Sequence, residues 1–406
     1  MRISKCAVCF AASLAFLALP SLAQEWTEQR VVQKFMEQSP YAREARARVA
    51  AAEAQALGRT LLPNPSVSYS REGAGFTEFF QAEQALPISG RRTLLREAGA
   101  AAIRTAEAEG AFDLWQARTN LRVAFYAALA AQDRARVQEA ALQEIDEIIR
   151  ILREREREGE GSKFDRIRAE RERAELLAQL ALLRAEFELF RAGVLAYLPP
   201  DTQVDTLSDA LESLAGSLDE SALVERAYVN REDYRAELAK LEQFRLEQRA
   251  AERLRIPEPV VGGGLKRADV GMDRTVAGAV IGITVPIPLF DRGQAEVSRY
   301  SAEQERVSAR LEILRQQIHA AVTGAVRAFN TRVSARDQYR RALGETGAEL
   351  VGIARVAYQE GEIGILQLLD AYRNQREARL RMIDIQAAVK EAELEVERVM
   401  GEEIGR

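Results

Sequence analysis

The chain has 406 residues, a formal net charge of −5, one histidine and two cysteines. The length allows two or three ordinary domains, and the acidic balance disfavours a nucleic-acid-binding protein, which needs cationic side chains to neutralise phosphates. So few histidines and thiols also leave little material for a metal centre or a nucleophilic active site, because such sites normally need several ligating or mutually activating groups.

Residues 1–23 have the organisation of a secretory signal peptide. A basic start precedes an uncharged, apolar-rich run over 6–19, and small residues stand at Ser21 and Ala23 before the expected cleavage point. The mature chain, 24–406, would contain no thiol, and neither cysteine stands where a lipid anchor would need it. The mature sequence has no apolar run of about 18 residues, so it predicts no transmembrane helix. An exported chain can still enter a membrane as a β-barrel.

Two groups of prolines mark the predicted strands. The segments beside them are short, partly alternating and rich in Ser, Gly and Val, which is typical of strands. At about ten residues, they have the length of a tilted transmembrane strand. In the fourth segment, Ala279, Ile281 and Ile283 alternate with their neighbours and are expected to face lipid. The predicted strands are 64–73, 78–87, 258–267 and 276–285.

Long proline-free tracts follow each pair of strands, over 88–198 and 289–406. Apolar residues within them recur in steps of three and four, which is the pattern of coiled-coil seams. The sequence therefore predicts very long helices over 91–158 and 292–359, each about 100 Å long at 1.5 Å per residue. No ordinary globular core needs helices of that length.

The chain is predicted to be a duplication. Each half contains a helix, two strands, a very long helix, a turn and a further helix. The first repeat is placed at 28–200 and the second at 219–400, and a polar linker over 201–218 joins them. Both repeats belong to one protomer spanning 24–406.

A Gly-Glu turn interrupts the helices in both halves, at 159–169 and 361–371, 202 residues apart. The glycine is expected at the left-handed position that ends a helix, and the cap of the returning helix follows three residues later, at Ser162 and Gly364. Three residues further on, the side chains of Asp165 and Gln367 are expected to reach back to the N–H of the cap, as in a capping box. Each turn would then be the tip of a helical hairpin. Helix capping alone explains these residues, and a docking surface or gate is the functional alternative. The residues concerned are Gly159, Ser162, Asp165, Gly361, Gly364 and Gln367, and the nearby acids Glu360, Glu362 and Asp370 are expected to make a negative periplasmic mouth.

Motifs for catalysis or cofactor binding are absent from the sequence. His319 lies in a long predicted helix without ligating partners, and a packed or solvated side chain explains it. The segment at 261–267 is glycine-rich but lacks the helix and Lys-Ser/Thr pair of a phosphate loop. The charged run over 153–160 forms i,i+3 pairs on a solvated helix end. The sequence therefore predicts no enzyme, no cofactor, no catalytic or metal residue and no nucleic-acid partner.

Four strands per chain cannot close a transmembrane barrel, because the smallest barrels have eight, and an open edge would leave backbone groups unpaired in lipid. The chains are therefore expected to associate. Two chains would give eight strands and a filled interior, whereas three would give twelve and an open bore. A tube of helices about 100 Å long would continue the barrel across much of a periplasm.

The chain resembles the TolC-like outer-membrane efflux family over essentially its whole mature length. The resemblance is carried by the duplicated tips, by "AYQEGEIGILQLLDAYRNQREAR" at 357–379, by "PISGRRTLLREA" at 87–98 and by "VPIPLFDRGQAEV" at 285–297. It implies a mainly α fold with transmembrane β. The homotrimer would form a twelve-stranded barrel in the outer membrane of a Gram-negative bacterium, continued by a twelve-helix periplasmic tube.

The resemblance also implies partners and a function. A periplasmic adaptor (membrane fusion) protein and an inner-membrane pump would deliver solutes to the duct, and outer-membrane lipid would surround the barrel. The segments "SGRR" and "PLFDRG" are similar to the heavy-metal cation subgroup. The alternatives are a drug efflux or type I protein secretion channel and a non-channel periplasmic coiled-coil adaptor. An adaptor would have one helical hairpin flanked by compact β domains, whereas this chain has two hairpins and four barrel-length strands.

Overall fold

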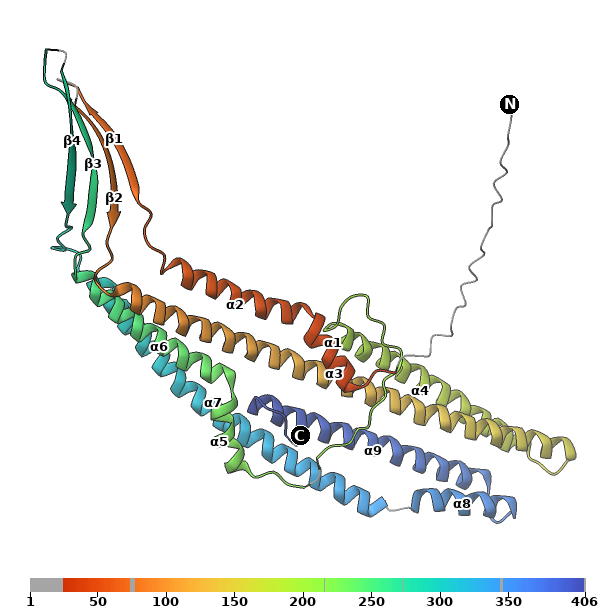
Figure 1. Ribbon diagram of the computed structural model, residues 1–406. Coiled ribbons are helices and arrows are strands. Elements are labelled where there is room, and N and C mark those ends of the chain that lie inside the picture. Colours follow the sequence, from red (N-terminus) through yellow and green to blue (C-terminus); the bar gives the residue numbers. More distant parts are fainter. Residues whose placement is uncertain (1–24, 74–76, 215, 273, 344–345, 405–406) are drawn as a thin grey trace, which may run out of the picture.

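The computed structural model describes residues 25–404, apart from 74–76, 215, 273 and 344–345, as an elongated chain (Figure 1). A four-stranded sheet lies at one end, and the helices run from it to two hairpin tips at the other end. The predicted signal peptide lies outside the described residues. The helices are α1 (Glu28–Gln38), α2 (Pro40–Gly58), α3 (Arg91–Glu158), α4 (Lys163–Leu195), α5 (Glu220–Asn230), α6 (Glu232–Glu252), α7 (Gln294–Leu343), α8 (Thr346–Gln359) and α9 (Ile365–Met400), with a 3₁₀ turn, η1, at Arg253–Arg255.

The long helix predicted over 91–158 is confirmed, because α3 spans Arg91–Glu158 without interruption. The second long helix, predicted over 292–359, is described as α7 and α8 on either side of residues 344 and 345. It also begins later than predicted. Gly293 has a φ of 81°, and its N–H donates to the Asp291 carboxylate at 2.9 Å, so a turn precedes the helix. Within the described residues, no helix is both long enough and apolar enough to cross a membrane.

All four predicted strands are present and form one antiparallel sheet in the order β1-β2-β3-β4. The central pair, β2 and β3, joins the two halves of the chain. Among the described residues, β1 and β4 each have a neighbour on one side only, so a single chain leaves both edges of the sheet open. The strands are β1 (Ser66–Glu72), β2 (Thr77–Ala85), β3 (Val260–Asp269) and β4 (Thr275–Thr284).

The register gives the sheet two chemically different faces. Directly paired residues share a face, and the set that includes Tyr69, Phe80, Leu265 and Ala279 is apolar along most of its length. We call this side the apolar face. The opposite side, the polar face, carries serines on β1 and glycines on β3 and β4. The apolar face comprises Val67, Tyr69, Phe80, Ala82, Val261, Leu265, Ala277, Ala279, Ile281 and Ile283, together with Gln84, Gly263 and Thr275 and the charged residues Arg71, Glu78, Arg267 and Asp269. The polar face comprises Ser66, Ser68, Ser70, Gln81, Glu83, Gly262, Gly264, Lys266, Gly278 and Gly282, together with Glu72, Thr77 and Thr284 and the apolar residues Phe79, Ala85, Val260, Ala268, Val276 and Val280.

Four hydrophobic cores follow one another along the helices. The first lies near the sheet, where α3 packs on α6 through Leu95 and Leu246. The next two lie at mid-length, one around Phe125 of α3 and one around Phe329 of α7. The last lies near the tips, where α3, α4, α8 and α9 meet around Leu152. Helix α3 contributes to three of these cores.

The segment between α4 and α5, predicted as a polar linker, is packed into the mid-length core. Its residues Val204, Leu207 and Leu211 are buried. The backbone of Trp26 pairs with this segment, because the Trp26 N–H donates to the Thr206 carbonyl at 3.1 Å. The bounds of the two repeats and of the linker stay a prediction.

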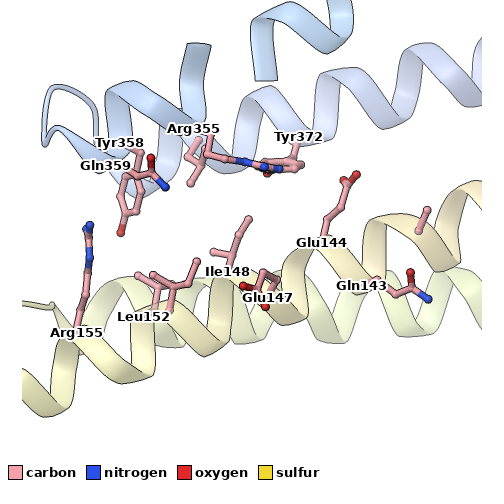
Figure 2. Close-up of a pocket in the computed structure, with 13 residues that line it drawn as sticks. Gln143, Glu144, Glu147, Ile148, Leu152, Arg155, Arg355, Tyr358, Gln359 and Tyr372 are labelled. Carbon is pink, nitrogen blue, oxygen red and sulfur yellow. Dashed lines mark hydrogen bonds between the residues drawn. The ribbon is translucent and has the colours of Figure 1, made fainter. Parts of the chain in front are cut away.

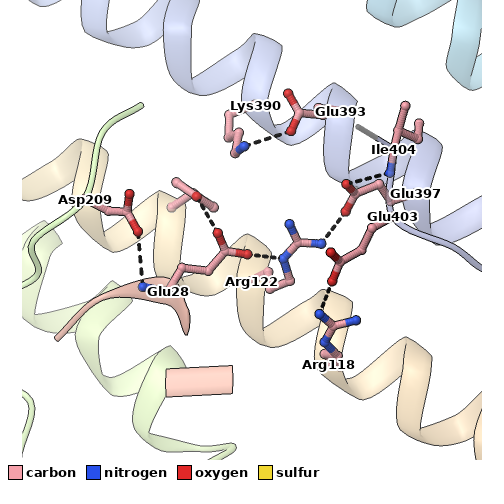
Figure 3. A network of polar contacts seen from close by, with 10 residues as sticks. Glu28, Arg118, Arg122, Asp209, Lys390, Glu393, Glu397, Glu403 and Ile404 are labelled. Atoms are coloured by element: carbon pink, nitrogen blue, oxygen red, sulfur yellow. Dashed lines mark hydrogen bonds and ion pairs between the residues drawn. The ribbon is translucent and has the colours of Figure 1, made fainter. Parts of the chain in front are cut away.

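A buried ionic network connects the two ends of the chain at mid-length (Figure 3). Arg122 of α3 lies between two carboxylates, Glu28 of α1 and Glu397 of α9, and forms an ion pair with each. The Tyr126 hydroxyl donates to Glu28 at 2.7 Å, and the Ile404 N–H donates to Glu397 at 3.2 Å. Arg118 pairs with Glu403 beside them. The network therefore connects α1, α3, α9 and the segment after α9.

The two carboxylates respond differently to the same arginine. Burial raises the pKa of Glu397, and the charge of Arg122 offsets this only in part. Burial also acts on Glu28, but Arg122 and the Tyr126 hydroxyl outweigh it and lower the pKa of Glu28. The difference has a physical cause, because the Glu397 side chain is 3% exposed and that of Glu28 is 12% exposed.

Replacing Arg122 with alanine should destabilise the fold by about 3–5 kcal/mol, because it leaves two buried carboxylates without a counter-charge. Denaturant unfolding of the purified protein, followed by circular dichroism, measures the change. Arg310→Ala, at an exposed residue of α7, is the matched control and should change stability by no more than about 0.5 kcal/mol. Equal effects of the two substitutions would contradict the role of the network.

Candidate functional site

Each helical hairpin ends in a turn closed by the same backbone bonds. At the first tip, Gly159 has a φ of 83° and ends α3. Its N–H donates to the Glu156 carbonyl at 3.3 Å, and the Glu160 N–H donates to the Arg155 carbonyl at 3.0 Å. These two bonds define a Schellman motif, in which a left-handed residue satisfies the last carbonyls of a helix. The predicted left-handed helix end is confirmed here.

The second tip repeats the first. Gly361 has a φ of 77°, its N–H donates to the Tyr358 carbonyl at 3.2 Å, and the Glu362 N–H donates to the Ala357 carbonyl at 2.9 Å. Every donor and acceptor lies 202 residues after its counterpart in the first tip. The two turns therefore have the same local structure, and both hairpins end in the same way.

The caps of the returning helices differ between the two tips. Ser162 and Gly364 are the N-caps of α4 and α9, as predicted. The Gly364 N–H donates to the Gln367 side chain at 2.9 Å, which is the predicted reach back to the cap. The corresponding prediction for Asp165 is wrong. Among the hydrogen bonds of the described residues, none joins the Asp165 carboxylate to the Ser162 N–H.

Side-chain length and an alternative acceptor account for this difference. Asp has one methylene fewer than the Gln or Glu that normally closes a capping box. The Ser162 hydroxyl instead caps α4 by itself, accepting from the Phe164 N–H at 3.1 Å. Each tip therefore uses one half of a capping box, the hydroxyl half at Ser162 and the carboxamide half at Gln367.

Both tips expose an apolar side chain two residues after the cap. Phe164 is 63% exposed and its counterpart Leu366 is 50% exposed. The acids predicted at the mouth, Glu360, Glu362 and Asp370, are also exposed. Each tip thus presents a small or polar cap beside an apolar side chain. The sequence pattern predicted the caps but not Phe164 and Leu366, although the matching positions of these two residues, 202 apart, are a signal that indicates them.

A cavity of about 570 Å³ separates the tip regions of the two hairpins (Figure 2). It lies between α3 on one side and α8 and α9 on the other. Two arginine–tyrosine pairs line it. The Arg155 guanidinium lies 5.6 Å from the centre of the Tyr358 ring, and Arg355 donates to the Tyr372 hydroxyl at 2.6 and 3.1 Å. Burial raises the pKa of Tyr358, so its hydroxyl stays neutral.

Ion pairs also join the two hairpins beside this cavity. Glu172 of α4 accepts from Arg373 of α9 at 2.8 Å, and Arg376 lies 3.9 Å from the same carboxylate. The Glu172 side chain is 17% exposed, so solvent screens this contact less than a surface pair. The sequence pattern does not predict these contacts, because nothing in it relates an acid on one hairpin to an arginine on the other.

The side chains at the two tips are suited to packing against a partner surface. In the part of the chain that the structure describes, no group of three or more His, Cys, Asp or Glu residues could hold a metal ion. His319 is exposed on α7.

Comparison with known proteins identifies the class of the protein. A sequence model of the outer membrane efflux protein family matches residues 223–402. The cobalt-zinc-cadmium resistance protein CzcC of Cupriavidus metallidurans is 25% identical over 358 residues, which cover 84% of this chain and 82% of CzcC.

Solved structures of this class share the fold. The match to CusC has a TM-score of 0.69 at 17% identity and covers 94% of this chain and 96% of CusC. The MtrE outer membrane channel of Neisseria gonorrhoeae matches with a TM-score of 0.70 at 19% identity, over 92% of this chain and 89% of MtrE. The CmeC outer membrane channel of Campylobacter jejuni matches with a TM-score of 0.70 at 15% identity, over 92% of this chain and 85% of CmeC.

The fold is therefore that of an outer-membrane efflux channel, mainly helical with a four-stranded sheet. Residues 223–402 match the outer membrane efflux protein family, and the chain as a whole has the TolC-like fold of the solved channels. The alternative of a non-channel periplasmic adaptor is wrong, and the protein extends from the outer membrane into the periplasm.

Changing Gly159 or Gly361 to valine should loosen each tip locally, because a left-handed conformation costs an L-residue about 1–2 kcal/mol. Hydrogen exchange of the tip amides measures this, and the Glu160 and Glu362 N–H groups should exchange about ten times faster. Gly352→Ala is the control. That glycine is inside α8 with no atom within 4 Å of an added Cβ, so alanine should stabilise the helix by about 1 kcal/mol. Unchanged exchange in the valine variants would contradict a structural requirement for glycine.

Proposed function

We propose that this chain is one of three subunits of the outer-membrane exit duct of a tripartite efflux system, which passes divalent heavy-metal cations out of the cell. The observation that carries the proposal is the sheet. It has one apolar face, one polar face and two open edges in a single chain. Such a sheet becomes stable in lipid only when further copies complete the hydrogen bonds of β1 and β4.

Strand length and charge distribution support insertion in the membrane. Strand β4 has 10 residues, which gives a length of about 33 Å along the strand and, after tilting, a height near the ~25 Å apolar band of outer-membrane barrels. Charged residues of the apolar face are confined to the end near the strand-connecting loops, at Arg71, Glu78, Arg267 and Asp269. The polar face would then line the bore.

Threefold assembly is favoured by the strand count. Three copies supply twelve strands, enough for an open bore, whereas the eight strands of two copies give an interior that side chains fill. A cyclic trimer also closes every edge, because β4 of one copy meets β1 of the next. Ala279, Ile281 and Ile283 of each copy would then face lipid, as the sequence predicts.

The paired tips are proposed to dock the periplasmic adaptor. Each tip combines a helix cap with an exposed apolar side chain, Phe164 or Leu366, and a trimer would present six of them at one end of the tube. An adaptor that binds both kinds of tip would connect the duct to an inner-membrane pump. Glu360, Glu362 and Asp370 would surround the mouth with negative charge, which favours cations.

Metal cations are proposed as the solute because of the relative at 25% identity, which is a cobalt-zinc-cadmium resistance protein. The alignment covers 84% of this chain and 82% of that relative. The proposed duct would conduct the cations without coordinating them tightly, since selection would belong to the pump.

A charge on the apolar face should prevent insertion. Ile281→Arg should destabilise the assembled protein by about 2–4 kcal/mol if the residue lies near the middle of the membrane. Ser68→Arg, on the polar face of the same sheet, is the matched control and should leave assembly intact. Native mass spectrometry of the membrane extract measures the trimer in both variants.

The outcome separates three possibilities. Loss of the trimer in Ile281→Arg alone supports the proposed orientation. Loss in Ser68→Arg alone would mean that the two faces are reversed. A wild-type protein that is monomeric or dimeric would contradict the threefold duct itself.

Larger side chains at the N-cap positions Ser162 and Gly364 should block adaptor docking. In the Ser162→Gln, Gly364→Gln double variant, we expect normal trimers and normal bilayer conductance but no adaptor binding and no growth in zinc, cobalt or cadmium. Ser162→Ala with Gly364→Ala is the matched control. It removes the Ser162 hydroxyl cap, which costs about 1 kcal/mol, but adds little volume, so it should still bind adaptor and support growth.

These growth assays use cells whose own copy of the gene is deleted. If the two double variants show the same adaptor binding and the same growth, the residues at the tips serve only to cap helices, and the adaptor docks elsewhere. If the wild-type chain restores resistance to a drug or restores protein secretion, but not growth in metal, the solute class is wrong while the duct stands.

A further inference from the structure

Four short segments join the sheet to the helices, and together they form one level of the molecule (Figure 1). We call this level the junction collar. Each of its segments contains prolines, aliphatic side chains and at least one arginine. The collar comprises residues 59–65, 86–92, 253–259 and 285–292.

The two segments that leave the sheet have the same local structure. The Ile88 N–H donates to the Leu86 carbonyl at 2.9 Å, and the Leu289 N–H donates to the Ile287 carbonyl at 2.9 Å. In each case a proline lies between the two bonded residues, so both are three-residue turns with a fixed centre. The flanking side chains point away from the protein. Ile88 is 66% exposed, Ile287 is 74% exposed and Leu289 is 61% exposed.

Further apolar side chains are exposed at the same level. Phe290, directly after the second turn, is 91% exposed, and Leu61 of the first segment is 62% exposed. Each such side chain in water forgoes about 1.5–3 kcal/mol of burial free energy. A contiguous group of them indicates a surface that is covered in the assembled state.

The apolar surface continues that of the sheet. Ile281 and Ile283 of the apolar face are followed by Val285, Ile287 and Leu289 at the same alternate spacing, and all five are exposed. The collar therefore lies where the lipid-facing side of β4 ends and the helices begin. On the proposed function, this is the boundary between the membrane and the periplasm.

The collar is positively charged in an otherwise acidic chain. Its four segments contain six arginines and two acids, whereas the whole chain has a net charge of −5. Both acids are already engaged, since the Ser89 hydroxyl donates to Glu258 at 2.5 Å and the Gly293 N–H donates to Asp291 at 2.9 Å.

Several of the arginines have a guanidinium nitrogen without a partner among the residues that the structure describes. Arg253, Arg255 and Arg292 are exposed, and their guanidinium groups make no hydrogen bond or ion pair with any residue that the structure describes. The Arg91 Nε is buried, and it too has no hydrogen-bond partner among the described residues. Arg91 and Arg253 line one side of a pocket of about 290 Å³ that also borders Ile287.

We propose that the junction collar binds phospholipids of the periplasmic leaflet of the outer membrane. The apolar–proline–apolar turns and Phe290 lie among the acyl chains, and Arg91, Arg253, Arg255 and Arg292 bind the headgroup phosphates. The guanidinium group suits this role because it offers several donors to phosphate oxygens. The inference rests on the proposed membrane insertion of the sheet, and it adds where insertion stops and what holds the chain at that depth.

Lipid-borne quenching of tryptophan fluorescence tests the depth. Three single variants each add one tryptophan to the two native ones: Phe290→Trp in the collar, Ile281→Trp in the sheet and Ile313→Trp on the exposed side of α7. The proteins are reconstituted in phosphatidylethanolamine–phosphatidylglycerol vesicles that carry bromine near the start of the acyl chain. Phe290→Trp and Ile281→Trp should both be quenched relative to wild type, and Ile313→Trp should not.

The same experiment separates the collar from the proposed function. Quenching of Ile281→Trp without quenching of Phe290→Trp overturns the collar and leaves the membrane duct intact. Absence of quenching at Ile281 overturns the duct and the collar together. Quenching of all three would show that lipid reaches the tube, and it would overturn the collar as the boundary.

Native mass spectrometry with added phosphatidylglycerol tests the arginines. Arg255→Gln with Arg292→Gln should weaken phosphatidylglycerol binding about thirtyfold, since two cationic contacts with the lipid surface are lost. Arg46→Gln with Arg310→Gln removes the same charge from exposed residues of α2 and α7 and should leave binding unchanged. Equal loss in both double variants would show a general charge effect, and no loss in either would remove the phosphate role. Both outcomes overturn the proposal.

Discussion

The continuity of α3 is the constraint on which the rest of the structure depends. This helix of 68 residues contacts α1, α2, α4, α6 and α9, and at 1.5 Å per residue it is about 100 Å long. It contributes to three of the four hydrophobic cores. A proline in a helix interior costs about 3 kcal/mol. The absence of proline over 88–198 therefore permits one continuous helix, which separates the sheet from the hairpin tip.

The side chains at the sheet end of the molecule differ in character from those at the tip end. At one end the sheet has an apolar face, and the junction collar beneath it combines exposed aliphatic side chains with arginines. At the other end the tips at Gly159 and Gly361 have compact turns, helix caps and exposed acids. The proposed duct follows from this polarity, because one end suits lipid and the other suits a protein partner in water.

At mid-length, contacts join segments from both ends of the chain. Arg122 brings together α1, α3 and α9 through Glu28 and Glu397, and the segment between α4 and α5 packs beside them with Leu207 buried. Glu172 and Arg373 join the two hairpins nearer the tips. A buried charge without its partner costs several kcal/mol, so these contacts fix how the halves are placed relative to one another.

The sequence by itself determined the elements whose causes are local. The proline-free tract with its apolar periodicity predicted the long helix α3, and the groups of prolines predicted where the four strands lie. Gly159 and Gly361 predicted the ends of α3 and α8. The tertiary structure decided everything that depends on residues far apart in the chain: the order of the strands, the two faces of the sheet, and the pairing of Arg122 with residues 94 and 275 positions away. It also decided that Gln367 reaches its cap whereas Asp165 does not. The physical reason is that periodicity and backbone conformation are encoded within a few turns, whereas strand pairing and buried ion pairs exist only once the long helices have packed.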